Sequence, residues 1–401
     1  MPQSFDLEKG ITYLVGNAKL ASNISLVPAL KPFDDNVTAF LVDVSKELMA
    51  DRKARTYSDV ITYAYWIRKA SLNSLKERFN SREYVRFGRG NVFHIAPSNV
   101  AVNFAYSLTA SLIMGNSNIV RVPSKDFEQI EIITAAYNRV LESYESLKPY
   151  IICVRYERNE EINSIFSNVA DVRIVWGGNQ TISEIRKSPL PPRSSEICFA
   201  DRFSIAVIDS DHYMEIEDKK KVAEDFYNDT YLTDQNACTS PRIVVWTGSK
   251  VKDAKNIFWS EEYKIVKNKY HFQSIQAVNK LAKVLEYAAI TKDVRIVEHT
   301  DNLIVRVEVP KITEELMNYF DNSGLFFEYE CGNISEIEKL CNDNKCQTVS
   351  YIGNKDLIIK LLEKGIRGID RVVPVGKTMD FDLIWDGCNL PAVLTRIVTF
   401  K

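Results

Sequence analysis

The spacing of hydrophobic residues divides the chain into a helical beginning and a longer region in which strands and helices alternate. Residues 1–33 carry three prolines and no clear period, so we expect a loose lead-in there. Apolar residues then recur at helical spacing, which predicts helices over 36–52 and 57–79.

From residue 84 onward, short apolar runs alternate with amphipathic segments on both sides of a proline-rich break at 188–195, a candidate domain boundary. The predicted strands are 91–96, 118–122, 150–156, 172–176, 203–208, 242–247, 302–308, 325–329 and 347–352. The predicted helices are 100–114, 126–146, 160–167, 180–187, 216–229, 272–289, 311–320, 334–342 and 355–364. This alternation predicts a two-lobed α/β protein with parallel sheets, crossover helices and a cleft between the lobes. The tail, 393–400, is a terminal strand that we expect to pair within the chain or with a partner subunit.

Composition narrows the class of protein. Lys plus Arg number 51 against 53 Asp plus Glu, so there is no basic field for nucleic acid or for an anionic membrane. The N-terminus shows no signal-peptide pattern, and the most apolar window, 100–120, is interrupted by asparagines and too polar to span a bilayer. Seven cysteines form no Cys-x-x-Cys pair, and four histidines have no metal-ligand spacing. We therefore expect a cytoplasmic protein without a membrane span, a nucleic-acid partner or a metal.

The sharpest chemical feature is DQNACTSPR, residues 234–242, a turn of polar and small residues directly before the apolar strand IVVW. It places Cys238 on a loop that a scaffold aims outward, with backbone N–H groups nearby for an oxyanion. The alternative is a buried cysteine that acts as a small hydrophobe.

Three turns in the first alternating block offer binding groups. Asn99 follows a strand in HIAPSNVAVN, as an amide donor or as a plain helix cap. Gly177 and Gly178 end another strand, where backbone N–H groups approach a pyrophosphate or form an ordinary tight turn.

The third turn, NIVRVPSKD (118–126), carries Arg121, Ser124 and Lys125 at the end of a strand. A cation and a hydroxyl there suit a ribose or a 2′-phosphate, and a solvated strand end is the alternative.

In this order, these segments resemble the aldehyde dehydrogenase superfamily and, more closely, its LuxC-like branch of fatty-acyl-CoA reductases. The resemblance runs from about residue 85 to the end of the chain. Its most specific motif is QNACTSPR (235–242), and the others are PSN (97–99), GNSNIVRVPSKD (115–126), WGG (176–178) and VPVGKTMDFDLIWDGCNLP (373–391).

The resemblance implies an aldehyde-dehydrogenase-like α/β fold with a Rossmann-type cofactor domain, an α/β catalytic domain and a short tail strand. The implied domains are a helical lead-in (1–60), a nucleotide-binding domain (61–209), a catalytic domain (210–370) and a C-terminal return with an oligomerisation strand (371–401). It makes Cys238 the nucleophile and Asn99 its oxyanion partner. Cofactor contacts fall on Arg121, Ser124, Gly177 and Gly178, with Lys125 beside them.

One departure from the family pattern bears on the reaction. Hydrolytic aldehyde dehydrogenases have a glutamate where this chain has Cys198, with Glu196 two residues away. Without a carboxylate base, water does not attack the acyl-enzyme, which then survives long enough to receive a hydride.

We therefore expect NAD(P)H-dependent reduction of an acyl thioester, fatty in character, to the aldehyde. Arg121 and Lys125 favour NADPH and leave NADH open. The expected partners are an acyl-CoA or acyl-protein donor, an acyl-activating synthetase subunit and further copies of the chain. The alternatives are a hydrolytic aldehyde dehydrogenase with Glu196 as its base, a non-catalytic acyl-binding subunit of a synthetase–reductase complex, and a glutamyl- or aspartyl-phosphate reductase.

Overall fold

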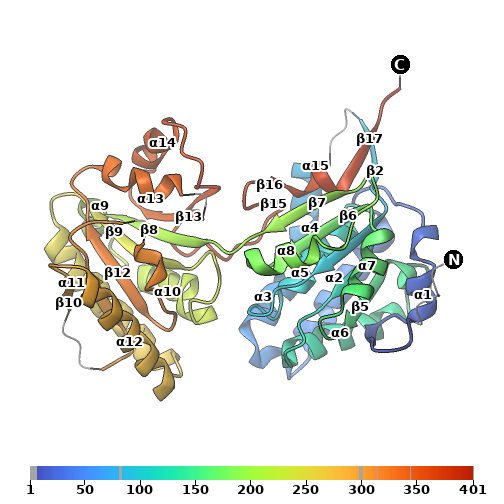
Figure 1. Ribbon diagram of the computed structural model, residues 1–401, viewed down its shortest axis with the longest axis horizontal. Coiled ribbons are helices and arrows are strands. Elements are labelled where there is room, and N and C mark those ends of the chain that lie inside the picture. The colour runs from blue at the N-terminus through green and yellow to red at the C-terminus, as the bar shows by residue number, and fades with distance from the viewer. Residues whose placement is uncertain (1–6, 81–83, 298–300, 314, 344, 401) are drawn as a thin grey trace. The chain divides into compact units, whose positions relative to one another are not determined.

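The computed structural model describes residues 7–80, 84–297, 301–313, 315–343 and 345–400. It contains two compact units, each with its own sheet (Figure 1). Unit 1 comprises residues 1–200 and 388–401, and unit 2 comprises residues 201–387. The chain is therefore divided after residues 200 and 387, whereas the sequence led us to divide it after residues 60, 209 and 370. The proline-rich break at 188–195 lies inside unit 1.

Unit 1 is built on a six-stranded sheet in the order β1-β5-β4-β3-β6-β7, parallel except for the antiparallel pair β1–β5. Its strands are β1 (Thr12–Val15), β3 (Asn91–Ile95), β4 (Ser117–Arg121), β5 (Ile151–Arg155), β6 (Val172–Trp176) and β7 (Ser195–Phe199). The expected loose lead-in is wrong, because β1 is an edge strand of this sheet. Strand β7 was also not predicted.

The helices of unit 1 cover both faces of this sheet. Phe93 of β3 packs with Phe166 in the core on one face, whereas the adjacent His94 points to the other face and bonds Ser107. The helices are α1 (Ala18–Ser22), α2 (Asp35–Ala50), α3 (Ser58–Trp66), α4 (Lys69–Phe79), α5 (Asn103–Ile113), α6 (Glu128–Leu141), α7 (Glu160–Asn168), α8 (Asn179–Ile185) and α15 (Leu390–Leu394). The single helix predicted over 57–79 is two helices, because Arg68 has extended backbone between α3 and α4.

The tail strand pairs within the chain. Strand β17 (Thr395–Val398) lies antiparallel to β2 (Val85–Gly88) in a two-stranded sheet of unit 1. The tail strand therefore has a partner strand within its own chain. Its role in oligomerisation stays a prediction. The short strand β16 (Cys388–Asn389) opens this last segment.

Unit 2 has a seven-stranded sheet in the order β10-β11-β12-β9-β8-β13-β14, parallel except at β10–β11. Its strands are β8 (Phe203–Asp209), β9 (Pro241–Thr247), β10 (Arg295–Ile296), β11 (Val305–Glu308), β12 (Leu325–Glu330), β13 (Cys346–Ile352) and β14 (Arg371–Pro374), with β15 (Ile384–Trp385) outside the sheet. Alternate residues of β8 and β9 enter two separate hydrophobic clusters, so both faces of this sheet are also covered.

The helices of unit 2 are α9 (Ser210–Glu215), α10 (Lys219–Asp229), α11 (Val251–Lys269), α12 (Ser274–Ile290), α13 (Glu338–Asn342) and α14 (Asp356–Leu362). They depart from prediction at three places, the first being the short helix α9, which was not predicted. Helix α11 was missed, although its buried Ala254, Phe258 and Ile265 have helical spacing. The helix predicted over 311–320 is wrong: the described part holds only the 3₁₀ helix Leu316–Asn318, which buries Leu316 with a single turn. Across the described ranges of both units, no helix is long and apolar enough to cross a membrane.

Candidate active site

Three loops of unit 1 leave the same edge of the sheet. Strands β3, β4 and β6 are parallel neighbours, so the segments that follow them emerge together at their carboxyl ends. The strand order reverses between β3 and β6, since β4 and β5 extend to one side of β3 and β6 and β7 to the other. Such a switch point is where open α/β sheets bind ligands.

Asn99 lies in the segment between β3 and α5, on one side of this switch point, and its side chain is exposed. The helix-cap interpretation is wrong for α5, because that helix begins at Asn103 and its N-cap is Val102, with no side-chain cap bond.

The Gly177–Gly178 turn connects β6 to α8 on the other side of the switch point. A Cβ added at Gly178 would meet no atom within 4 Å, and one added at Gly177 would meet Thr181 Cγ2 at 3.0 Å. The backbone at Gly178 is therefore open to the close approach of a ligand such as a pyrophosphate.

The turn after β4 holds its two cations differently. Arg121 donates from Nη2 to the Tyr156 carbonyl at 3.3 Å, and its guanidinium lies 4.8 Å from the centre of the Tyr156 ring. Ser124 and Lys125 are exposed, and Lys125 Nζ lies 4.9 Å from the Phe127 ring centre. Arg121 is thus anchored in packing, and Lys125 is the cation with more freedom to reach a phosphate.

Cys238 lies in unit 2, on the loop between the 3₁₀ helix Tyr231–Thr233 and β9, and is partly exposed. Ser204 of β8 donates its hydroxyl to the Cys238 carbonyl at 2.7 Å. Thr239 beside it donates to the Met379 sulfur at 3.3 Å. The interpretation of Cys238 as a sealed core cysteine is therefore not what the structure shows, and the loop around it is held from two directions.

Gln235 is the internal brace of this loop, and the sequence analysis did not single it out. Its side chain is fully buried, donates to the Pro241 carbonyl at 3.1 Å and accepts from the Gly324 N–H at 2.7 Å. Gln235 and the preceding Asp234 both have φ near +53°, a left-handed backbone that costs about 1 kcal/mol or more per non-glycine residue. The buried hydrogen bonds fix a turn that this sequence would not adopt unaided.

The thiol of Cys238 is protonated in this environment. Burial raises its pKa to about 12, and the nearby carboxylates of Asp386 and Asp201 also raise it, while Arg242 lowers it. Burial likewise raises the pKa of Asp386 to about 7, against the opposing effect of Arg371. Asp386 has a left-handed backbone, φ +48°, and one buried carboxyl oxygen without a hydrogen-bond partner among the described residues. The Cys238 thiol therefore shares unit 2 with a carboxyl group, Asp386, whose pKa is raised to about 7.

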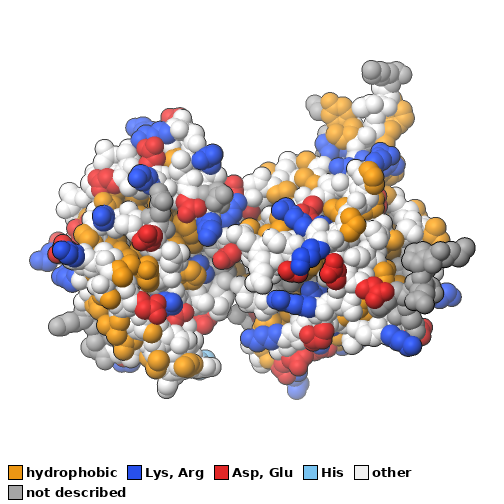
Figure 2. All heavy atoms as spheres, viewed as in Figure 1, with side chains coloured by type: hydrophobic (Ala, Val, Ile, Leu, Met, Phe, Trp, Pro, Cys, Tyr) orange, Lys and Arg blue, Asp and Glu red, His pale blue; other side chains and the backbone are white. Residues whose placement is uncertain are grey.

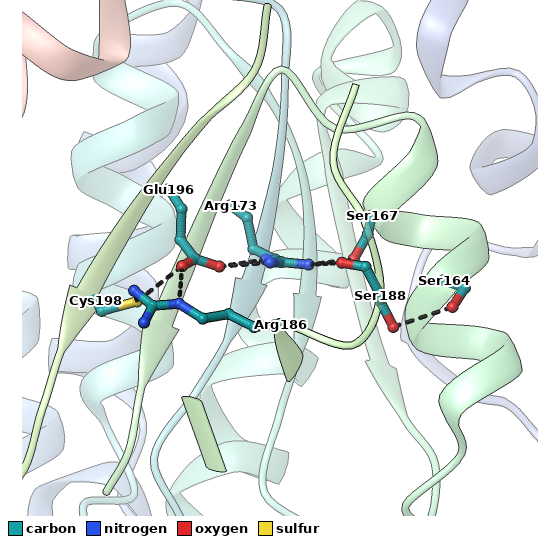
Figure 3. A network of polar contacts seen from close by, with 7 residues as sticks. All are labelled: Ser164, Ser167, Arg173, Arg186, Ser188, Glu196 and Cys198. Carbon is teal, nitrogen blue, oxygen red and sulfur yellow. Dashed lines mark hydrogen bonds and ion pairs between the residues drawn. The ribbon is translucent and has the colours of Figure 1, made fainter. Parts of the chain in front are cut away.

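Glu196, the alternative base, is fully occupied by two arginines of unit 1 (Figure 3). Its Oε2 accepts from Arg173 Nε at 2.8 Å and its Oε1 from Arg186 Nε at 2.7 Å. Burial raises the Glu196 pKa, but the hydrogen bonds from Arg186 and Arg173 outweigh it and leave the pKa below its usual range. Cys198 donates its thiol to Glu196 Oε1 at 3.3 Å, and burial raises the Cys198 pKa to about 11.

The contacts of the described histidines do not make any of them a general base in place of Glu196. His94 is buried in unit 1 between Ser107 and Asn118, and burial lowers its pKa to about 4. His212 and His271 are exposed, and His299 lies outside the described residues. Within the described ranges, no group of three or more His, Cys, Asp or Glu side chains is arranged to hold a metal ion.

The structure thus gathers Asn99, Gly177, Gly178 and the Arg121–Lys125 turn at one edge of the unit 1 sheet. Cys238 lies in the other unit, with Gln235, Ser204 and Asp386. Gln235 stands inside the motif that marks the loop, and Asp386 stands in the closing WDG. No spacing in the sequence indicates that Gln235 holds the Cys238 loop or that Asp386 raises the pKa of the Cys238 thiol.

Comparison with known proteins gives a family and a fold. The family model described as Acyl-CoA reductase (LuxC) matches residues 19–399. A search of curated proteins found no match. Aldehyde dehydrogenase 21 from Physcomitrella patens, solved with succinate, has a similar structure with a TM-score of 0.68 at 11% identity, covering 95% of this chain and 89% of that one.

Two further solved structures resemble the chain. Salicylaldehyde dehydrogenase from Pseudomonas putida G7 has a TM-score of 0.67 at 14% identity, covering 95% of this chain and 88% of that one. A 3,6-anhydro-L-galactose dehydrogenase in complex with NAP has a TM-score of 0.62 at 11% identity, covering 98% of each chain. At these identities the similarity establishes the aldehyde dehydrogenase fold.

Proposed function

The chain belongs to the LuxC family of acyl-CoA reductases, an aldehyde-related group of oxidoreductases, and we propose that it reduces an acyl thioester to the aldehyde through an acyl-enzyme on Cys238. The observation that carries the proposal is the Cys238 loop: a partly exposed thiol on a strained turn that buried Gln235 holds in place. Strain of this kind persists where the surrounding structure over-determines it, often at functional sites.

In the first half-reaction, the Cys238 sulfur bonds to the thioester carbonyl carbon and the bond from that carbon to the donor sulfur breaks. The departing thiolate takes up the proton that Cys238 loses, so acyl-CoA and thiol give acyl-enzyme and free CoA. Asn99 and the Cys238 backbone N–H stabilise the oxyanion, and removal of one such donor costs about 3–4 kcal/mol of transition-state stabilisation.

In the second half-reaction, a nicotinamide cofactor supplies hydride to the thioester carbon when it is bound. The carbon–sulfur bond to Cys238 then breaks, the aldehyde leaves, and one proton from solvent restores the thiol. The open backbone at Gly178 fits the approach of a pyrophosphate, and exposed Lys125 fits a 2′-phosphate, which supports NADPH with NADH as the alternative.

The occupied state of Glu196 disfavours hydrolysis of the acyl-enzyme. A general base needs a free lone pair at the water and a pKa near the working pH. Each carboxylate oxygen of Glu196 already accepts from an arginine, and the pKa of the group is lowered. An aldehyde dehydrogenase that uses this residue as its base is therefore the weaker alternative.

The test mixes the purified protein with acyl-CoAs of graded chain length and NADPH or NADH, and follows cofactor oxidation and aldehyde formation. Without cofactor, intact-protein mass spectrometry should show an acyl adduct on the parent and none on Cys238→Ala. Reduction by Cys238→Ala at the parent rate would end the proposal. Free acid formed from aldehyde and NAD would favour the hydrolytic alternative.

A protein that neither turns over nor forms the adduct, yet binds an acyl-activating synthetase tightly, would be the non-catalytic subunit instead. If a synthetase-bound acyl group is reduced and acyl-CoA is not, the physiological donor is the protein-bound acyl group. A small acyl phosphate accepted in place of either thioester would point to the glutamyl- or aspartyl-phosphate reductase class.

A further inference from the structure

The last residue of helix α10, Asp229, is a carboxylate in a place that is unfavourable for one. Figure 2 shows many acidic side chains, in red, on the surface of each unit, whereas Asp229 has no exposed surface. The carboxyl end of a helix carries partial negative charge, which repels a carboxylate. A buried charge also needs hydrogen bonds to compensate for lost water. The groups that bond to Asp229 therefore show what this carboxylate stabilises.

Asp229 accepts two backbone N–H groups from the segment 376–379, which begins 147 residues later in the chain. The Gly376 N–H donates to Oδ2 at 2.6 Å, and the Thr378 N–H donates to Oδ1 at 3.0 Å. Because both carboxylate oxygens are used, the segment is held in one register against the end of α10. Burial raises the pKa of Asp229 to about 7, and the two bonds from the segment oppose that rise. The ionised carboxylate, which accepts both bonds, therefore prevails above neutral pH.

The 376–379 segment is fitted closely to its surroundings on two sides. Gly376 has φ +90°, which glycine adopts without strain, and a Cβ added there would lie 2.6 Å from the Cβ of Asp225 in α10. On the other side, Arg371 of β14 donates from Nη1 to the Thr378 carbonyl at 3.0 Å. Thr378 is thus bonded through its N–H to Asp229 and through its carbonyl to Arg371, which leaves the segment little freedom to shift.

The end of this segment contacts the Cys238 loop. Met379 follows Thr378, and its sulfur accepts the hydroxyl of Thr239 at 3.3 Å. Thr239 is the residue directly after Cys238 and is almost fully buried. A few residues after Met379, the carboxylate of Asp386 is near enough to Cys238 to raise the pKa of its thiol further. The chain that Asp229 holds therefore borders the Cys238 loop at two points.

We propose that Asp229 is a positioning residue for Cys238: it fixes the 376–379 segment, and the segment fixes the Cys238 loop through Met379 and Thr239. The inference rests on the proposed role of Cys238 as the nucleophile. Acyl transfer needs the sulfur held in one orientation toward the carbonyl carbon. Alkylation by a small reagent needs only an accessible thiolate. Release of the segment should therefore slow the first reaction and accelerate the second.

The test compares the parent with Asp229→Asn at a pH above the Asp229 pKa of about 7. Asparagine offers its oxygen to one of the two N–H groups and an NH₂ donor to the other, so the segment is partly released. We expect kcat for acyl-CoA reduction to fall about tenfold with KM little changed. Alkylation of Cys238 by iodoacetamide should become severalfold faster, because burial is what raises the pKa of this thiol. Mass spectrometry of the peptides also reads fully buried Cys346 of β13, whose alkylation should not change.

The matched control is Asp225→Asn, which makes the same chemical change one turn earlier on α10. Asp225 pairs with Lys221 and does not accept a bond from the segment, so kcat and alkylation should both stay at the parent values. Thr239→Val removes the contact at the other end of the segment and leaves Asp229 in place, so it serves if Asp229→Asn does not fold. Where both variants fold, their combination should alkylate no faster than the faster single variant, because both changes release the same contact.

An equal acceleration at Cys346 would show a general loosening of unit 2 and would overturn the proposal. So would additive effects of the Asp229 and Thr239 changes, a Cys238 alkylation rate equal to that of the parent, or a kcat equal to that of an active parent. Alkylation needs no turnover. A parent that does not reduce acyl-CoA would therefore count against the proposed function, while the alkylation rates still decide whether Asp229 positions Cys238.

Discussion

Replacing Glu196 by glutamine should destabilise unit 1 by much more than a surface charge change. The carboxylate lies on β7, with its side chain 15% exposed, between Arg173 of β6 and Arg186 just after α8 (Figure 3). Arg173 is only 3% exposed, and its other bonds go to the Ser167 hydroxyl and the Ser188 carbonyl. Glutamine keeps the shape but removes the charge, and it can turn an NH₂ donor toward one of the two guanidinium groups.

The cost follows from the buried cation that remains. Breaking one side of a buried ion pair typically costs 3–5 kcal/mol, and we take about 3 because Glu196 keeps some contact with water. For a unit of this size that corresponds to a fall in Tm of roughly 6–12 °C. The folded pKa of Glu196 is lowered from 4.5, so its contribution is complete above that value and is lost as the pH falls through the lower folded value. Parent and variant should therefore differ most at neutral pH and converge in acid.

The assay is thermal unfolding at several pH values, with Glu184→Gln on α8 as the matched control. Glu184 pairs with Lys187, and both side chains are about half exposed, so its loss should cost under about 1 kcal/mol. An equal fall in Tm for both variants at neutral pH would refute the reasoning. Activity separates the roles further: loss of turnover in a Glu196→Gln protein of undiminished Tm would make Glu196 a catalytic base.

Three other predictions concern the reaction. Cys238→Ala should abolish aldehyde formation and leave Tm within about 1 °C of the parent, because the side chain is small and partly exposed; a measurable rate of reduction in this variant would contradict its role. Asn99→Ala should lower kcat about 10²–10³-fold with KM little changed, as measured by steady-state kinetics, and a loss smaller than tenfold would remove it from the oxyanion site. Alkylation of Cys238 should be slow at neutral pH and accelerate toward its pKa of about 12. Asp386→Asn should shift that pH profile downward, with the largest difference above about pH 7 where Asp386 is ionised, and an unchanged profile, read by mass spectrometry of the alkylated peptide, would show that the two groups do not interact.

Much of the architecture follows from local patterns. Strands such as β3 and β6 are mainly apolar, buried along their whole length and flanked by turns, so their positions and parallel pairing could be predicted within about two residues. The errors occur where a local signal was ambiguous. The apolar spacing of 57–79 runs through the break at Arg68, and β1 is a four-residue edge strand whose pairing partner, β5, lies more than 130 residues away. Edge strands have partners on one side only, so their composition carries a weak signal.

The candidate site also has a part that the sequence suggests and a part that only the tertiary structure decides. The sequence alone singled out Cys238, Asn99 and the glycine turn as candidates, because a polar turn before a buried strand and turns at strand ends have residue types and spacings that can be read along the chain. Only the tertiary structure decided how those groups are held and charged. Gln235 is a brace because distant Gly324 and Pro241 close around it, and Asp386 raises the pKa of a thiol almost 150 residues earlier in the chain. Burial and electrostatic coupling depend on distance in space, which residue spacing along the chain does not specify. For the same reason, the pattern of α12 marked it as a helix, and only the packing beneath it showed that Val284 and Tyr287 are the apolar residues that it buries.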